Sequence, residues 1–200
     1  MIDASALDEK PVLTGARIRL VPLDARHAAD YHAATLDPEI RRLTGSHRNF
    51  TREEIERWCA GAAARAGRLD LAVEDRESGR FLGDIALIDV DPDNGHATLR
   101  ILLVAGATDR GLGSEAVRLL LGHAFDRVRL HRVQLEVWDF NHRARRAYER
   151  CGFTVEGRMR QALRWDGAWH DALVMAALRT EWADGAGRAD GAAAEADATG

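Results

Sequence analysis

The sequence predicts a single α/β domain with the element order β-α-α-β-β-β-α-β-α-β-β. The main observation is periodicity, because stretches of alternating polar and apolar residues, typical of strands, are interleaved with stretches of helical spacing. The second observation is size and composition. The 200 residues, of which 46% are hydrophobic and 30% charged, are enough for one ordinary domain with its own core.

The first half of the chain contains a strand, two helices and an antiparallel meander of three strands. These elements are predicted at residues 17–23, 24–36, 51–67 and 69–104. The second helix begins with Thr51 and Glu54, which have the spacing of a capping box. The meander is divided into three strands by turn signals at residues 77–79 and 92–95.

The second half contains a helix, a strand, a helix and a two-stranded hairpin. These elements are predicted at residues 112–127, 132–138, 141–151 and 153–178. The alternating letters RVQLEVW indicate the strand. Gly152 is a natural end for the second helix, and Asp166 with Gly167 forms the turn of the hairpin.

Both ends of the chain differ in composition from the middle. Residues 183–200 are rich in Ala, Gly and Asp and contain no large apolar residue. They cannot bury enough surface to offset the entropy of folding. We expect a disordered tail there, a flexible N-terminal arm at residues 1–11, and one domain over residues 12–182.

Composition argues against several classes of protein. The net charge of −4 gives no basic footprint for nucleic acid. Cys59 and Cys151 form no CxxC motif, which argues against a disulfide framework and a zinc ribbon, and the eight histidines form no HExxH motif. The start of the chain lacks the features of a signal peptide, and no apolar run reaches the roughly 18 residues of a membrane span. We therefore expect a cytoplasmic protein with no metal, no nucleic-acid partner and no membrane association.

A glycine-rich loop precedes the helix predicted at residues 112–127, and such loops commonly hold phosphates. Gly106 and Gly111 have the Walker spacing, but Leu112 stands where a P-loop needs lysine, which excludes that motif. The letters GLGSEA also fit the dinucleotide pattern, with Glu136 at about the 20-residue distance expected of a ribose-binding acid. Against this, only one helix and three strands follow, whereas a dinucleotide fold continues with several β-α units.

Coenzyme A is the third candidate ligand for this loop. Its pyrophosphate needs several backbone N–H groups that point the same way, and residues 109–114 supply them where the helix begins. Gly111 and Gly113 lack a Cβ atom and allow a close approach, and Arg110 can add a positive charge. For the loop taken alone, an ordinary strand-to-helix turn remains an alternative.

The segment FNHRARRAYERCGF bears on which ligand the glycine-rich loop binds. Asn141 and Tyr148 are seven residues apart, nearly two helical turns, so their side chains lie on one face of the predicted helix. Ala144 and Ala147 lie on or near that face and are small enough to leave room for a ligand. The alternative is a capped amphipathic helix, in which Asn141 is the N-cap and Tyr148 a half-buried core residue.

Three stretches together resemble the Gcn5-related N-acetyltransferase (GNAT) superfamily: DRGLGSEAVRLLLGHAF, LHRVQLEVWDFNHRARRAYERCGFTVEGRMRQAL and WDGAWHDALVMAAL. The resemblance covers residues 12–180, and the branch it resembles is that of the ribosomal-protein alanine and serine N-terminal acetyltransferases (RimJ/RimL-like). It implies a mixed, mostly antiparallel sheet that splays at its central strands, with helices on both faces. It also implies transfer of an acetyl group from acetyl-CoA to a primary amine in a ternary complex.

The resemblance also assigns residues to the co-substrate. In such enzymes the pantetheine arm lies along the strand before the glycine loop and the pyrophosphate lies on the loop. The residues assigned to acetyl-CoA are Leu102, Leu103, Val104, Asp109, Arg110, Gly111, Leu112, Gly113, Ser114, Asn141, Ala144 and Tyr148. Thr108 departs from the family pattern, because the loop usually begins with Gln or Arg. We therefore expect the side chain at this position to bind the phosphates more weakly, while the backbone N–H groups of the loop still bind them.

The transfer needs one group that protonates the leaving thiolate and one that deprotonates the attacking amine. By resemblance Tyr148 lies near the sulfur, and a tyrosine of pKa about 10 can donate to a thiolate whose conjugate acid has a pKa near 8.5. Tyr148 is therefore the predicted general acid. Glu136 is the candidate base, since it lies on the strand that faces the cleft, and the alternative is a solvated carboxylate paired with an arginine. The sequence does not separate three weaker candidates, Asp84, Asp89 and Glu74.

The sequence does not reveal the acceptor amine. We expect residues 36–50 and the hairpin around Trp165, Asp166 and Trp169 to bind it, because loops carry specificity. The resemblance offers a protein N-terminus, a polyamine, an amino acid or an antibiotic amine as acceptor, and a homodimer as assembly. Two alternatives stay open: a domain that binds acetyl-CoA without transferring it, and a dinucleotide-dependent oxidoreductase.

Overall fold

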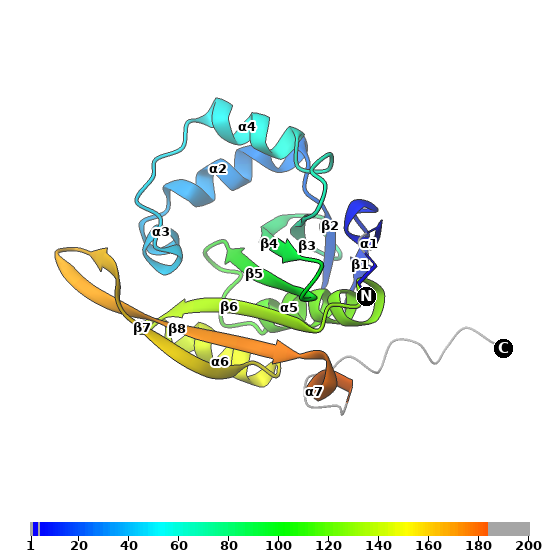
Figure 1. The fold of residues 1–200 in the computed structure, drawn as a ribbon. Coiled ribbons are helices and arrows are strands. Elements are labelled where there is room, and N and C mark those ends of the chain that lie inside the picture. The colour runs from blue at the N-terminus through cyan, green and yellow to red at the C-terminus, as the bar shows by residue number, and fades with distance from the viewer. Residues whose placement is uncertain (1, 4, 184–200) are drawn as a thin grey trace.

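The structure is a computed structural model that describes residues 2–3 and 5–183 of the chain. One eight-stranded sheet has the order β1-β2-β3-β4-β5-β6-β8-β7 (Figure 1). Its strands are β1 (Leu13–Thr14), β2 (Ile18–Pro22), β3 (Leu69–Asp75), β4 (Phe81–Asp91), β5 (His96–Leu103), β6 (Arg132–Trp138), β7 (Thr154–Trp165) and β8 (Ala168–Leu178). Every neighbouring pair is antiparallel except β5 and β6, which are parallel. The predicted mixed, mostly antiparallel sheet is confirmed.

Helices cover both faces of this sheet, as predicted. In chain order they are α1 (Ser5–Asp8), α2 (Ala28–Leu36), α3 (Pro38–Thr44), α4 (Arg52–Ala60), α5 (Leu112–Gly122), α6 (His142–Arg150) and α7 (Arg179–Ala183). Helices α2, α3 and α4 lie over one face, and α5 and α6 lie over the other (Figure 1). Short turns of 3-10 and π-helix extend α2 and α5 at residues 25–27 and 123–127.

The hydrophobic core is divided between the two faces. On the α5 and α6 side, Phe125 and Leu120 are fully buried and belong to a large cluster that includes the inward residues of most strands. On the other side, Tyr31 from α2 and Cys59 from α4 pack with Phe81 from β4 in a smaller cluster. Each helix layer thus has its own core, and the sheet separates the two cores.

The two central strands separate after a short contact. β5 and β6 pair only where His96–Thr98 meets Arg132–Gln134. Beyond that point β5 stays paired with β4 as far as Leu103, and β6 stays paired with β8 as far as Trp138. The predicted splay of the central strands is confirmed, and it leaves the second half of β5 without a neighbour on one side.

Residues 5–10 are packed against the domain, whereas the sequence predicted a flexible arm at residues 1–11. Leu7 of α1 is only 1% exposed and belongs to the main core. The Nζ atom of Lys10 donates hydrogen bonds to the carbonyl oxygens of Leu7, Arg65 and Arg68 at 2.8, 2.7 and 2.6 Å. These contacts with distant residues could not be read from composition. The disordered tail predicted at residues 183–200 lies, except for its first residue, outside the described residues.

One helix was missed in the segment expected to be a loop at residues 36–50. The N-cap of helix α3 is Asp37, whose carboxylate accepts hydrogen bonds from the backbone N–H groups of Glu39 and Ile40. Its C-cap is Gly45, which has a φ of +67°. The Asp-Pro start and the glycine stop were the available signals. In contrast, the helix predicted at residues 51–67 was too long, since α4 ends at Ala60.

The packing of α1 gives a first testable prediction. We expect Leu7→Ala to lower the free energy of unfolding by about 2–5 kcal/mol, because it leaves a cavity in the core. Val12→Ala is the control, since Val12 is 59% exposed, and it should cost less than about 0.5 kcal/mol. Denaturant unfolding measures both variants. Equal, small losses at both positions would contradict the packed N-terminal helix.

Candidate active site

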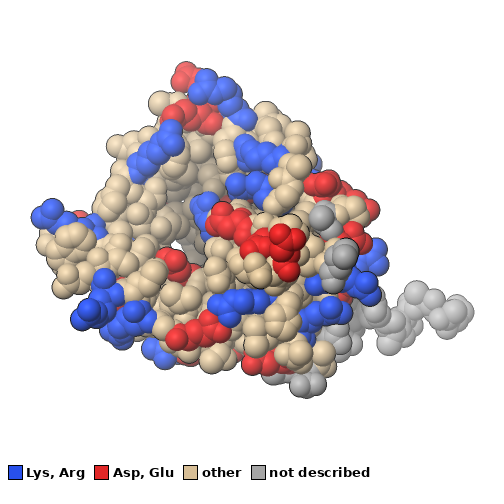
Figure 2. Space-filling model, in the orientation of Figure 1, with Lys and Arg blue, Asp and Glu red and all other residues tan. Residues whose placement is uncertain are grey.

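A cavity of about 580 Å³ lies where β5 and β6 separate. Its walls are the second half of β5, the end of β6, helices α3 and α6, and the loop that leads into α5. In the space-filling view this face of the molecule is hollowed between the helices at the top and the β7–β8 hairpin below (Figure 2). The sheet itself is therefore open at its centre.

The loop before α5 has the geometry of an anion cradle. Gly111 is the N-cap of α5 with a φ of +76°, and a Cβ atom there would lie 3.2 Å from Nη2 of Arg17. A Cβ atom on Gly113 would lie 3.0 Å from Cδ1 of Leu103. The first backbone N–H groups of a helix have no partner within it, so they can bind an anion that the two glycines allow to come close.

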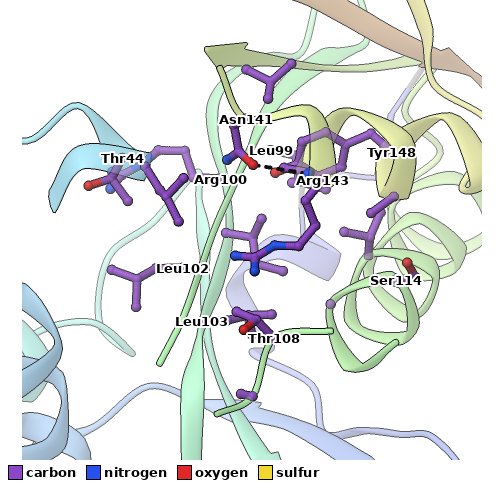
Figure 3. Close-up of a pocket in the computed structure, with 18 of the residues that line it drawn as sticks. Thr44, Leu99, Arg100, Leu102, Leu103, Thr108, Ser114, Asn141, Arg143 and Tyr148 are labelled. Atoms are coloured by element: carbon purple, nitrogen blue, oxygen red, sulfur yellow. Dashed lines mark hydrogen bonds between the residues drawn. The ribbon is translucent and has the colours of Figure 1, made fainter. Parts of the chain in front are cut away.

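Arginine side chains hold this loop in place. Arg17 donates from Nη1 to the carbonyl oxygen of Arg110 at 2.7 Å and pairs with Glu115 at 3.1 Å. Arg143 of α6 points into the cavity and pairs with Asp109 at 2.9 Å (Figure 3). Arg143 lines the cavity, whereas Arg110, the predicted source of charge, is not among the lining residues. Sequence reasoning missed Arg143 because only the fold brings α6 to the loop.

The backbone of β5 offers hydrogen-bonding groups to the cavity. The N–H of Val104 donates to the carbonyl oxygen of Leu82 on β4. Because backbone groups alternate along an antiparallel strand, those of Leu99, Ile101 and Leu103 point the other way, toward the separating β6. Leu103 therefore presents its backbone to the opening, while Val104 does not.

Helix α6 forms the wall opposite the loop. Asn141 is its N-cap, and Oδ1 accepts a hydrogen bond from the N–H of Ala144 at 3.1 Å (Figure 3). The Tyr148 ring packs against Phe153 with ring centroids 5.8 Å apart. Burial, with a smaller contribution from Cys151, raises the pKa of Tyr148 well above its ordinary value. Both residues play the structural roles named as the alternative, and both also line the cavity.

Glu136 reaches the cavity from β6. Its side chain is exposed, and it lies on the face of the sheet opposite to the buried Leu135 and Val137. Within the described residues its carboxylate makes no hydrogen bond or ion pair. The alternative of a carboxylate paired with an arginine is therefore not seen at Glu136, and the group is available to a ligand.

The structure separates the three weaker carboxylate candidates. Glu74 lies outside the cavity and is held by His27 at 3.1 Å and by two arginines. Asp89 is exposed at an irregularity of β4, with a φ of +49°, and it does not line the cavity. Asp84 lines the cavity and is 6% exposed. Its burial raises its pKa to about 7, against an opposing contribution from Arg100.

Most of the predicted site residues meet in this one cavity. The lining includes Leu102, Leu103, Asp109, Gly111, Gly113, Ser114, Glu136, Asn141, Ala144 and Tyr148. Val104, Arg110 and Leu112 are not part of it, and Leu112 is a core residue, 2% exposed. The sequence did not point to several further lining residues, among them Arg100, Trp138 and Arg143. These come from elements whose faces only the tertiary structure defines.

The segments expected to bind the acceptor do come together. His47, from the segment 36–50, stacks on Trp165 of the hairpin with ring centroids 4.8 Å apart. Thr44 of α3 lines the cavity. Trp165, Asp166 and Trp169 are not in the lining, and Trp169 is 58% exposed.

Three further observations concern metal sites, membrane-spanning helices and cysteines. Among residues 2–3 and 5–183, no cluster of His, Cys, Asp or Glu has the makeup of a metal site. No helix in that part of the chain is long and apolar enough to span a membrane. Both cysteines are free and buried.

With this geometry in view, comparison with known proteins identifies the class: the chain belongs to the acetyltransferase (GNAT) domain family, which matches residues 17–154. It is 31% identical over 146 residues to an N-acetyltransferase 9-like protein of Caenorhabditis briggsae, covering 68% of this chain and 73% of that protein. It is also 31% identical over 104 residues to the putative ribosomal N-acetyltransferase YdaF of Bacillus subtilis, covering 52% of this chain and 57% of that protein.

A solved structure has the same fold. The spermidine N-acetyltransferase from Vibrio cholerae in complex with CoA and spermine superposes with a TM-score of 0.77 at 20% identity, covering 84% of this chain and 98% of that one. The predicted superfamily is therefore confirmed, and the chain is an N-acetyltransferase that uses acetyl-CoA to acetylate an amine. The dinucleotide alternative is not supported, since the sheet has one parallel pair and no series of parallel β-α units.

The cradle gives the second prediction. We expect Gly111→Val to abolish acetyl-CoA binding, because its side chain occupies the space for the pyrophosphate and crowds Arg17. Gly106→Val is the matched control. Gly106 also has a positive φ, +83°, so backbone strain is common to both variants. A Cβ atom at Gly106, however, meets nothing within 4 Å. Calorimetric titration with acetyl-CoA measures binding. Retained binding by Gly111→Val, or equal loss in both variants, would count against the cradle.

Proposed function

We propose that this enzyme transfers the acetyl group by direct attack of a primary amine on acetyl-CoA in a ternary complex, with Tyr148 as general acid and Glu136 as a base. The observation that carries the proposal is the opening between β5 and β6, because it places Tyr148 and Glu136 on one cavity with the phosphate cradle. A co-substrate in this opening has its pyrophosphate at one end and its thioester at the other.

We assign the binding of acetyl-CoA to three parts of the cavity. The backbone of the α5 loop around Gly111 and Gly113 holds the pyrophosphate, with Arg143 supplying charge beside it. The backbone of Leu103 and Ile101 pairs with the pantetheine arm as a neighbouring strand would. The small side chain of Ala144 leaves room for that arm. Thr108 offers only a hydroxyl where the family usually has a longer polar or charged side chain.

Tyr148 is suited to giving a proton rather than taking one. Its raised pKa keeps the hydroxyl protonated at neutral pH, so it cannot act as the base. The thiolate that leaves has a conjugate acid of pKa about 8.5, so full transfer is uphill, and the favourable contribution is a hydrogen bond that strengthens as the C–S bond breaks. Tyr148 regains its proton from solvent after the product leaves.

Glu136 takes a proton from the acceptor nitrogen, directly or through a water molecule. Support comes from its position on the cavity and from its carboxylate, which has no partner among residues 2–3 and 5–183. An α-amine, with a pKa of about 7.7–8.0, is about a tenth neutral at pH 7, whereas a lysine-type amine of pKa about 10.4 is neutral far less often. The pKa of the acceptor amine therefore determines how much the reaction needs a positioned base.

The acceptor is a protein N-terminus or a small-molecule amine. The names of the relatives point to both, since one is a putative ribosomal acetyltransferase and another is a spermidine acetyltransferase. We further propose a cytoplasmic enzyme that forms a homodimer and has no nucleic-acid or membrane partner. The net charge of −4 supports the absence of a nucleic-acid partner.

The third prediction concerns the general acid. Tyr148→Phe removes one hydroxyl and is expected to lower turnover by about 10²-fold or more while acetyl-CoA binding stays nearly the same. Thiol release from acetyl-CoA measures turnover, with peptides beginning in Ala or Ser and with spermidine as acceptors. Calorimetric titration measures binding. Gly111→Val should show the reverse pattern, a loss of binding first. Unchanged turnover in Tyr148→Phe, or a parallel loss of binding, contradicts the general-acid role.

A further inference from the structure

Arg100 of β5 is a cation that lines the cavity and has no ion-pair partner there. Its side chain is exposed, and among residues 2–3 and 5–183 its guanidinium makes no hydrogen bond or ion pair. On the same face of the sheet, by contrast, Arg68 pairs with Asp70 at 2.6 Å. A guanidinium has five N–H donors in a planar fork that matches a carboxylate. The donors of Arg100 are therefore open to an anionic group of a ligand.

The register of the sheet places Arg100 across the opening from Glu136. Thr98 and Gln134 are the last pair between β5 and β6. Because these strands are parallel, two more residues along each of them lead to Arg100 and Glu136, whose side chains lie on the same face. Both side chains line the cavity, and in the part of the chain that the structure describes no ion pair joins them. A cation and a carboxylate thus flank the opening where the strands begin to separate.

The nearby carboxyl group of Asp84 does not neutralise Arg100. The positive charge of Arg100 acts to lower the pKa of Asp84, but burial has the larger effect and raises that pKa to about 7. The carboxyl group of Asp84 is therefore only partly charged at neutral pH. No ion pair between the two side chains occurs among the described residues, so the charge of Arg100 remains for a ligand.

The remaining walls on this side of the cavity are largely apolar. Ile40 and Leu43 of α3 and Trp138 of β6 line it. Helix α3 packs closely there, since a Cβ atom on its C-cap Gly45 would lie 2.6 Å from Cζ2 of Trp138. Arg100 lies on the side of the opening toward this helix (Figure 3). A second ammonium group of a polyamine would be repelled by Arg100, whereas an apolar chain with one anionic group would fit.

We propose that Arg100 binds a carboxylate of the acceptor and thereby selects an amine that carries one, as a free amino acid with an apolar side chain does. The inference rests on the proposed acetyl transfer and narrows its acceptor. The amine lies toward Glu136, and the carboxylate accepts two parallel N–H···O bonds from the guanidinium. An acidic residue near a peptide N-terminus offers the same carboxylate, and the choice of test acceptors distinguishes the two sources.

The fourth prediction concerns the acceptors that the wild type prefers. Leucine, methionine and phenylalanine are each compared with the corresponding amide, and the peptide Leu-Asp-amide is compared with Leu-Asn-amide. We expect kcat/KM to be at least about 10-fold higher for the member of a pair that has the carboxylate. An adjacent carboxylate raises the pKa of the amine, which leaves less of it neutral. Ionisation of the amine would therefore favour the amides, and the expected preference is opposite to it. Spermidine is included as the polyamine, and thiol release measures turnover.

Variants at Arg100 test whether this side chain causes the preference. Arg100→Gln is expected to raise KM for the carboxylate acceptors by about 10- to 100-fold, with kcat and the turnover of the amides nearly unchanged. Arg100→Lys should recover part of the loss, because lysine keeps the charge without the planar fork. Arg146→Gln is the matched control, since Arg146 is exposed on α6 outside the cavity lining and its loss removes the same charge. Calorimetric titration should show unchanged binding of acetyl-CoA in all three variants.

The outcomes separate this inference from the proposed function. An active wild type that prefers the amides or spermidine overturns the role of Arg100 and leaves acetyl transfer intact. So does an Arg100→Gln variant that loses acids and amides equally, which is the result of a purely structural role. Preference for Leu-Asp-amide alone, lost in Arg100→Gln, supports the inference and identifies an acidic peptide as the source of the carboxylate. A wild type that binds acetyl-CoA but releases no thiol with any amine overturns the proposed function, and the role of Arg100 falls with it.

Discussion

The separation of β5 from β6 is the constraint on which the rest of the structure depends. The two strands pair over three residues, and each then follows its outer neighbour, β4 or β8. Gly83 helps to fix β5 to β4, because a Cβ atom there would collide with the carbonyl oxygen of Leu102. Backbone groups of β5 that an ordinary sheet would satisfy are left facing a cavity, and buried backbone groups need partners. We therefore propose that a ligand with its own amides and carbonyls, such as pantetheine, pairs with these groups.

The same separation lets residues from both faces of the sheet line one cavity. The glycine loop that we propose as the phosphate site and Tyr148 lie on the α5 and α6 side, while Asp84 and Glu136 lie on the side of α2 and α3. A thioester held in the opening thus has a proton donor on one side and carboxylates on the other. The guanidinium of Arg143 lies beside the loop, where it pairs with Asp109.

Local patterns predicted much of this fold, and long-range contacts account for what was missed. The strand at Arg132–Trp138 and the hairpin around Asp166 were predicted closely, because alternation and turn residues act over a few positions. The spacing of Asn141 and Tyr148 likewise placed both on the cavity. Helix α1 and the three hydrogen bonds of Lys10 depend on residues far away in the chain, and so does the burial that distinguishes Asp84 from other carboxylates. Composition and spacing contain no record of such contacts.

Amide hydrogen exchange along β5, resolved by NMR, tests the central claim most directly. With saturating acetyl-CoA, the amides of Ile101 and Leu103 are predicted to exchange more slowly, because they gain partners in the opening. The amide of Val104 already donates to Leu82 and should change little, which makes it an internal control. Binding of acetyl-CoA with no added protection at Ile101 and Leu103, or with equal protection along the whole strand, would contradict the account of the separated strands as the site of the co-substrate.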